Sequence, residues 1–213
     1  IKEIAKTEFA KNIKLDISTN ATLLSKDVID LLNKFAGGLL RFSIDAYKDQ
    51  DELIRYHTKW NSVIDGINNS TDLKEGWETV TQTCIQTLNA IGIHNLLWFF
   101  DEYCKNNNNQ NFHLGFTTVR GKEWMRHELV PMSYRQEEIA KLEDFIEKSW
   151  LCNHSQHHTR ETKAVQGLIT ALSNKENNDL ALRKKAKEYY TKLNKLRDVD
   201  YWKTFSHLEF LNE

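Results

Sequence analysis

Four strand-like segments alternate with helix-like segments along the chain, and this alternation restricts the fold more than any other sequence feature. The strand-like segments are rich in β-branched residues or alternate apolar with polar positions. They cover residues 13–18, 39–45, 79–87 and 112–119. The helix-like segments cover residues 26–35, 51–68, 93–105 and 134–150. Such alternation predicts βα units, a parallel sheet and right-handed crossovers, but it leaves open whether the sheet is doubly wound or a barrel.

The segments outside this repeat have their own expected structures. The first residues place apolar side chains on one helical face, which indicates a helix already in progress in a chain whose beginning has been lost. The apolar residues of that face are Ile1, Ile4, Ala5 and Phe9. Gly37 and Gly38 are expected to end the first helix of the repeat. Residues 106–110 and 154–160 are predicted to be polar loops, and residues 161–213 to be helical throughout.

Charge and cysteine content exclude several classes of function. The chain has 29 basic and 30 acidic residues, so its net charge of -1 gives no electrostatic reason to expect nucleic acid or an acidic membrane as a partner. Cys84, Cys104 and Cys152 are widely spaced and form no CxxC pair. This spacing indicates neither a zinc knuckle nor a disulfide framework and fits a reducing, cytoplasmic compartment. The longest apolar stretch, residues 91–100, is too short to span a bilayer.

Each predicted strand ends in polar residues. These residues are Ser18, Thr19 and Asn20; Ser43 and Asp45; Thr87 and Asn89; and Thr117, Thr118 and Arg120. In parallel α/β folds the carboxyl ends of the strands form the binding crevice, so four polar ends favour a polar, zwitterionic ligand. Ser, Thr and Asn also cap helices routinely, and capping remains an alternative for each residue by itself.

Two stretches of the sequence resemble motifs of the radical S-adenosylmethionine (SAM) enzymes. Residues 18–24 (STNATLL) resemble the family's "TNGtll" segment after the third barrel strand, with Ala21 where Gly is usual. Residues 41–47 (RFSIDAY) resemble its fourth-strand "SiDg" motif, and residues 51–57 (DELIRYH) supply the downstream Arg. The order and spacing of these motifs match the family more specifically than either motif alone.

Later segments extend the resemblance over nearly the whole chain. Residues 77–89 are similar to the fifth strand and its terminal Asn, and residues 112–131 to the sixth strand and its exit. Residues 193–208 (LNKLRDVDYWKTFSHL) resemble the tail of the twitch or SPASM-like subgroup, except that Ser206 and His207 replace the usual Pro-Glu. The family's CxxxCxxC cluster loop and GGEP-type strand are absent from residues 1–213 and are expected before residue 1.

This resemblance implies a fold and a reaction. The fold would be a partial (β/α) TIM-type barrel over residues 1–150 and a C-terminal helical, auxiliary region over residues 151–213. In the complete enzyme, a [4Fe–4S] cluster would cleave SAM reductively to a 5′-deoxyadenosyl radical that abstracts hydrogen from an unknown substrate, either a peptide or a small molecule. A flavodoxin or ferredoxin would supply the electron. The fragment alone is expected neither to hold the cluster nor to cleave SAM.

The resemblance also assigns roles to individual residues. Ser43 would hydrogen-bond the SAM methionyl carboxylate, and Arg55 would add a charge-assisted bond worth roughly 1.5–3 kcal/mol. Asn20 and Asp45 would lie on the ribose or substrate side, and Thr19 would also be a cofactor-binding residue. Thr118 would lie near the adenine. We expect the side chains of Ser43 and Arg55 to converge on one pocket, with Asn20 and Thr118 lining it.

Three other interpretations compete with this one. Cys152 and the histidines of residues 154–158 (HSQHH) suggest a metal site, but their spacing matches no standard zinc framework. Arg120 and His127 have the loose spacing of an Arg/His pair seen in small helical ribonucleases. The main rival is a non-catalytic α/β binding or scaffold module, because fold does not fix function.

Overall fold

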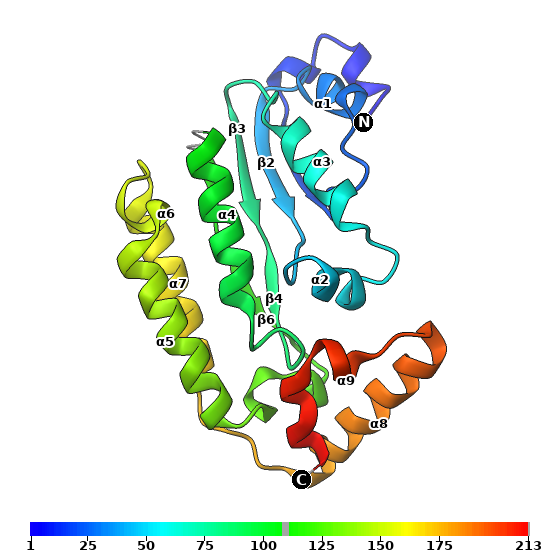
Figure 1. Ribbon diagram of the computed structural model, residues 1–213. Helices are drawn as coiled ribbons and strands as arrows, with labels where there is room; N and C mark the ends of the chain where they lie inside the picture. The colour runs from blue at the N-terminus through cyan, green and yellow to red at the C-terminus, as the bar shows by residue number, and fades with distance from the viewer. Residues whose placement is uncertain (108–110, 213) are drawn as a thin grey trace.

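A four-stranded parallel sheet forms the centre of the protein in the computed structural model, which describes residues 1–107 and 111–212 (Figure 1). Its strands are β1 (Lys14–Thr19), β2 (Gly37–Phe42), β3 (Trp77–Thr81) with β4 (Thr83–Ile85), and β5 (Phe112–His113) with β6 (Phe116–Thr118). Thr79 pairs with Phe112 and Thr83 pairs with Phe116. Both pairs have the same offset, so β4 and β6 continue the lines of β3 and β5. The predicted parallel sheet, with its strands adjacent in sequence order, is confirmed.

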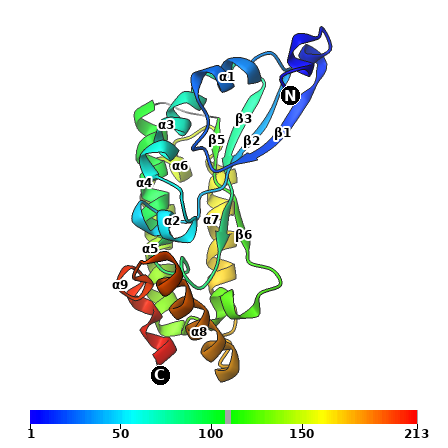
Figure 2. The ribbon, with the colours of Figure 1, turned by 90° about the vertical axis from the view of Figure 1, so that its right-hand side faces the viewer.

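Helices pack mainly on one face of this sheet, as Figure 2 shows. The helices within the strand repeat are α1 (Lys26–Leu32), α2 (Asp49–Ile54), α3 (Trp60–Ser70) and α4 (Ile93–Asn107). Residues 108–110, in the predicted polar loop 106–110, lie outside the described part of the chain. Strand burial follows the same division: Leu40 and Phe42 are fully buried towards the helices, whereas Lys14, Asp16 and Ser18 of β1 are exposed on the other face. On that open face Arg41 forms an ion pair with Asp16 of the neighbouring strand.

The sheet is open, and it does not close into a barrel within the described residues. β1 forms one edge and β5 with β6 the other. An apolar groove of about 720 Å³ runs beside β1 and is lined by Ile17, Leu24 and Val28 among others. Leu23, at the rim of this groove, is 82% exposed. The finer prediction of a TIM-type barrel therefore rests on the resemblance alone.

The C-terminal part contains further helices, which make two groups. α5 (Met132–Lys148), α6 (Trp150–Asn153) and α7 (His158–Leu172) pack on one another beside α4. α8 (Leu180–Arg197), α9 (Tyr201–Thr204) and the 3-10 helix η5 (Ser206–Asn212) lie beyond the carboxyl ends of the strands (Figure 1). The 3-10 helices η3 (Glu123–Met125) and η4 (His127–Leu129) connect β6 to α5. Among the described residues no helix is both long and apolar enough to cross a membrane.

Several predicted segments are wrong in detail. Gly37 and Gly38 do not end α1: they begin β2 at positive φ angles of 119° and 146°, and a Cβ on Gly38 would lie 1.9 Å from the carbonyl oxygen of Leu15. The expected first helix is two short 3-10 turns, η1 (Ile4–Lys6) and η2 (Ala10–Asn12), and Phe9 is exposed.

Two predicted helical boundaries are also wrong. The predicted helix over residues 51–68 is two helices, because the chain turns after Arg55 with His57 at a φ of 73°. The predicted loop over residues 154–160 includes the start of α7. The region 161–213 is interrupted after α7 and again at Asp198, which takes a left-handed conformation.

Candidate functional site

The exit of β2 holds a cluster of buried polar groups centred on Asp45. The Asp45 carboxylate accepts a hydrogen bond from the Cys84 backbone N–H at 2.8 Å through Oδ1. Its Oδ2 lies 2.9 Å from Nη2 of Arg55. The backbone N–H of Asp45 donates to Oδ1 of Asp51 at 2.8 Å. Asp45 therefore ties the end of β2 to β4 on one side and to α2 on the other.

Asp51 lies in the first turn of α2, and Arg55 is the residue that follows the end of this helix. Asp51 accepts backbone N–H groups of Asp45 and Ala46, but burial dominates and raises the pKa of Asp51 to about 6. Its Oδ2 and the Nε of Arg55 are buried and have no hydrogen-bond partner among the described residues. The Arg55 side chain remains 27% exposed. The cluster thus presents one guanidinium, oriented by Asp45, at the mouth of the sheet.

Residues of β4 and of the loop after it complete the cluster. Asn89 donates from Nδ2 to the carbonyl oxygens of Asp45 at 2.6 Å and Cys84 at 3.0 Å, and its Oδ1 accepts from the Gln86 N–H. Thr83 donates from its hydroxyl to the carbonyl oxygen of Ile44 at 2.7 Å. Burial, followed by the charge of Asp45, raises the pKa of the Cys84 thiol. These hydrogen bonds join the end of β2 to β4 and the loop after it. They also satisfy buried polar groups, which would be costly to leave without a partner.

Ser43 and Asp45 both follow the last residue of β2, Phe42. The N–H of Ser43 continues the strand ladder to the carbonyl oxygen of Thr19 at 2.7 Å, and the intervening Ile44 is buried in the core. The Ser43 hydroxyl has no hydrogen bond to the described residues. The structure therefore brings Ser43, Asp45 and Arg55 to one strand end.

Thr19 and Asn20, at the end of β1, make local turns. Thr19 accepts from the Ala21 N–H at 3.1 Å, and Asn20 accepts from the hydroxyl of Thr22 at 2.9 Å. These bonds hold Ala21 in a left-handed conformation with a φ of 68°, the conformation in which Gly has no steric cost. Asn20 is exposed, and its Oδ1 is occupied by this turn.

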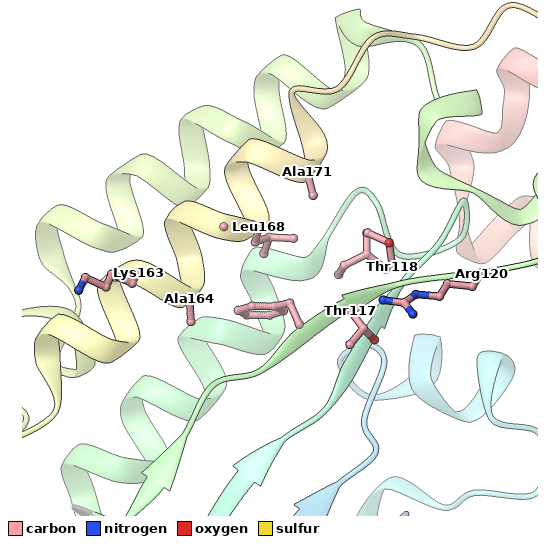
Figure 3. A pocket seen from close by; sticks show the side chains of 10 residues that line it. Thr117, Thr118, Arg120, Lys163, Ala164, Leu168 and Ala171 are labelled. Atoms are coloured by element: carbon pink, nitrogen blue, oxygen red, sulfur yellow. The ribbon is translucent and has the colours of Figure 1, made fainter.

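Thr118 does not join the cluster. Its strand partner is Ile85, whereas Cys84 pairs with Thr117. Because side chains alternate between the two faces, Thr117 shares the face of Cys84 and Thr118 points to the other. Thr118, together with Thr117, lines a pocket of about 510 Å³ between β6 and α7 (Figure 3).

Two members of the cluster, Asp51 and Cys84, are not among the site residues that the sequence predicts. Asn89, in contrast, is one of the polar strand-end residues named from the sequence. A usable signal was the acidic residue in the first turn of the helix that follows Asp45, at a spacing of six residues. Cys84 has no comparable signal, because it takes part through its backbone N–H.

The described residues contain no group of three or more His, Cys, Asp or Glu side chains able to hold a metal ion. In the predicted His/Cys loop, Cys152 is buried in α6 and His157 packs against His113. His127 is buried and its Nε2 lies 2.9 Å from the carbonyl oxygen of Ala171, whereas Arg120 is exposed on the pocket beside β6. This arrangement therefore supports neither a metal site at Cys152 and the nearby histidines nor a ribonuclease-type pair of Arg120 and His127.

The fold and this cluster define an α/β protein with a parallel sheet, a polar site at the carboxyl end of β2 and C-terminal helices. Comparison with known proteins adds no closer assignment: no protein-family model, no curated protein and no solved structure matches the chain.

Proposed function

We propose that the chain is the SAM-binding part of a radical SAM enzyme and that the mouth of β2 receives the methionyl end of SAM. The observation that supports this most is the partly exposed guanidinium of Arg55, which Asp45 holds at the carboxyl end of β2, the parallel strand that Ser43 directly follows. Ligands of parallel α/β sheets bind at this end.

Arg55 and Ser43 would bind the carboxylate of the methionyl group. A guanidinium presents donors in a fixed fork that matches a carboxylate, and a hydroxyl adds one further donor. Asp45 takes one Arg55 nitrogen and thereby fixes the direction of the others. In this proposal Asp45 is a positioning residue, because Cys84 and Arg55 already occupy its two oxygens.

The residues present fit SAM but not the iron–sulfur cluster. Cys104 and Cys152 are buried on helices, burial raises the pKa of both thiols, and neither lies in a metal-binding group within the described chain. Thiolates are the ligands that such clusters require. SAM in this enzyme class supplies hydrogen-abstraction chemistry, and in the proposal a CxxxCxxC segment outside residues 1–213 holds the cluster that this chemistry requires.

Amide NMR spectra recorded while SAM is added test the proposal. We expect the largest shifts at the backbone N–H groups of Ser43, Asp45 and Arg55, and methionine should shift the same signals. Adenosine, which lacks the carboxylate, should leave the Arg55 signal in place. A chain that shifts none of these signals with SAM would favour the rival assignment as a binding or scaffold module.

A further inference from the structure

The outer edge of β6 has unpaired backbone groups. Thr83 donates its N–H to the carbonyl oxygen of Gly115, and Val119 donates to that of Ile85. In a parallel pair, alternate residues of a strand face the partner, so the backbone groups of Phe116 and Thr118 face outwards. They have no hydrogen-bond partner among the described residues. Such an edge is a template for pairing with another chain.

The same edge is closed one step earlier by α7. Glu161, fully buried, accepts the outward N–H of Leu114 at 2.8 Å and lies 2.9 Å from Nδ1 of His113. This contact anchors the first half of α7 against the edge. After Leu114, no side chain of the described residues bonds the outward backbone groups of this edge. The pocket lies beside this part of the edge.

Most of the α7 residues that line this pocket are small. Besides Lys163, its helix wall contains Ala164, Gly167, Leu168 and Ala171, and a Cβ added at Gly167 would meet no atom within 4 Å. The sheet wall combines the apolar side chains of Ile85 and Phe116 with the hydroxyls of Thr117 and Thr118. Figure 3 shows the pocket between α7 and the strand. A partly apolar pocket of about 510 Å³ beside free backbone donors and acceptors suits an apolar side chain on an extended backbone.

The charges at the pocket have one sign. Arg120 and Lys163 are the charged side chains among its described lining residues, and Figure 3 places them at opposite ends. No carboxylate of the described chain forms an ion pair with either of them. An occupant with acidic groups would complement both ends.

From these observations we infer that the groove between β6 and α7 binds an extended peptide segment with an acidic side chain. The peptide adds a strand to the free edge, its backbone bonds Phe116 and Thr118, an apolar side chain fills the cavity beside Gly167, and its acidic group contacts Arg120 or Lys163. This site goes beyond the proposed function, because it uses no residue of the Asp45–Arg55 cluster.

Fluorescence anisotropy with two labelled octapeptides tests this site. One peptide alternates valine with glutamate, and the other alternates valine with lysine. The glutamate peptide should bind at least about tenfold more tightly, a factor that corresponds to 1.4 kcal/mol. Gly167→Leu should weaken its binding by roughly tenfold or more, because the added side chain fills the cavity. Gln166→Leu, on the exposed neighbouring position, should leave the affinity unchanged.

Amide NMR adds a readout on the unmodified chain, so the test does not depend on whether the variants fold. The bound glutamate peptide should shift the N–H signals of Phe116 and Thr118 in the unmodified chain, and Gly167→Leu should leave SAM-dependent shifts at Arg55 intact. The inference would be overturned if Gly167→Leu left the affinity for the glutamate peptide unchanged, or if the bound peptide did not shift the N–H signals of Phe116 and Thr118. Equal affinity for the lysine peptide, or preferential binding of a labelled oligothymidylate, would also overturn it.

Discussion

Gly66 and Gly167 both lie within helices, but their surroundings differ. A Cβ on Gly66 would lie 2.0 Å from the backbone oxygen of Ala21, whereas one on Gly167 would meet nothing. We expect Gly66→Ala to lower the free energy of unfolding by about 1–3 kcal/mol, because α3 must move away from the turn after β1. Gly167→Ala should raise it by about 0.5–1 kcal/mol. Urea unfolding of the two variants checks the pair, and equal effects would contradict the close approach of α3 to Ala21.

Asp51 gives the stability a pH dependence with a defined sign. Burial raises its pKa from 3.8 to about 6, so between these values the folded chain binds more protons than the unfolded chain. The contribution of Asp51 to the free energy of unfolding is therefore fully present below pH 4 and is lost as the pH rises towards 6. A change of this size corresponds to about 2–3 kcal/mol.

Asp51→Asn isolates this contribution, because Asn can still accept the N–H groups of Asp45 and Ala46 through Oδ1. The stability advantage of the unmodified chain over the variant should grow on going from pH 7 to pH 4.5. Urea unfolding at both pH values measures it. An advantage that is constant over this range would show that Asp51 keeps its ordinary pKa in the folded chain.

At the scale of elements, α2 is held by the C-terminal region. The carbonyl oxygen of Leu53, near the end of α2, accepts from the Tyr201 hydroxyl at 2.8 Å and from Nη1 of Arg197 at 3.0 Å. Arg197 also stacks over the ring of Tyr56, with its guanidinium carbon 4.7 Å from the ring centroid. These contacts fix the turn that carries Arg55, because carbonyls in the last turn of a helix lack helical partners.

Tyr201→Phe should therefore cost about 1 kcal/mol and speed hydrogen exchange at the amides of Arg55, Tyr56 and His57. Tyr189→Phe is the matched control, since the Tyr189 hydroxyl has no hydrogen bond within the described chain. Hydrogen-exchange mass spectrometry reads the effect locally. If both variants exchange alike over residues 55–57, the C-terminal region does not hold this turn.

The sequence predicted the positions of those helices and strands that have a clear local pattern of apolar residues. The four strands and α1, α4 and α5 follow from apolar periodicity. The break between α2 and α3 was not predictable, because it depends on Glu52 accepting the N–H of Trp60 at 2.7 Å and on Arg55 reaching back to Asp45. Breaks in the C-terminal region did have a local signal: Asp179 caps α8 and Asp200 caps α9.

The whole molecule has a sheet with one face covered by helices and a C-terminal region placed across its carboxyl end. His207 of η5 reaches the end of β4, where its Nε2 lies 2.8 Å from the carbonyl oxygen of Thr87. Burial lowers the pKa of His207, which favours its neutral form at this contact. The C-terminal region therefore contacts the chain after β4 through His207 and the end of α2 through Arg197 and Tyr201.

The candidate site was predictable as far as topology decides it. Parallel strands place their carboxyl ends together, and this brought Ser43, Asp45 and Arg55 to one end of β2. The choice between Thr117 and Thr118 was not predictable, because the face of a side chain relative to the next strand depends on strand register. The hydrogen bond from Asp45 to β4 was also not predictable, because its partner there is the backbone N–H of Cys84 and any residue type supplies such a group.

Calorimetric titration of SAM into the unmodified chain and into Arg55→Ala tests the central claim most directly. We expect the variant to bind SAM roughly tenfold or more weakly, since a lost charge-assisted bond is worth about 1.5–3 kcal/mol. Arg55→Lys should recover part of the affinity, because an ammonium cannot reproduce the fork of a guanidinium. Arg120→Ala, outside the cluster, should bind SAM as the unmodified chain does. Equal SAM affinity in Arg55→Ala and the unmodified chain would contradict the proposed site.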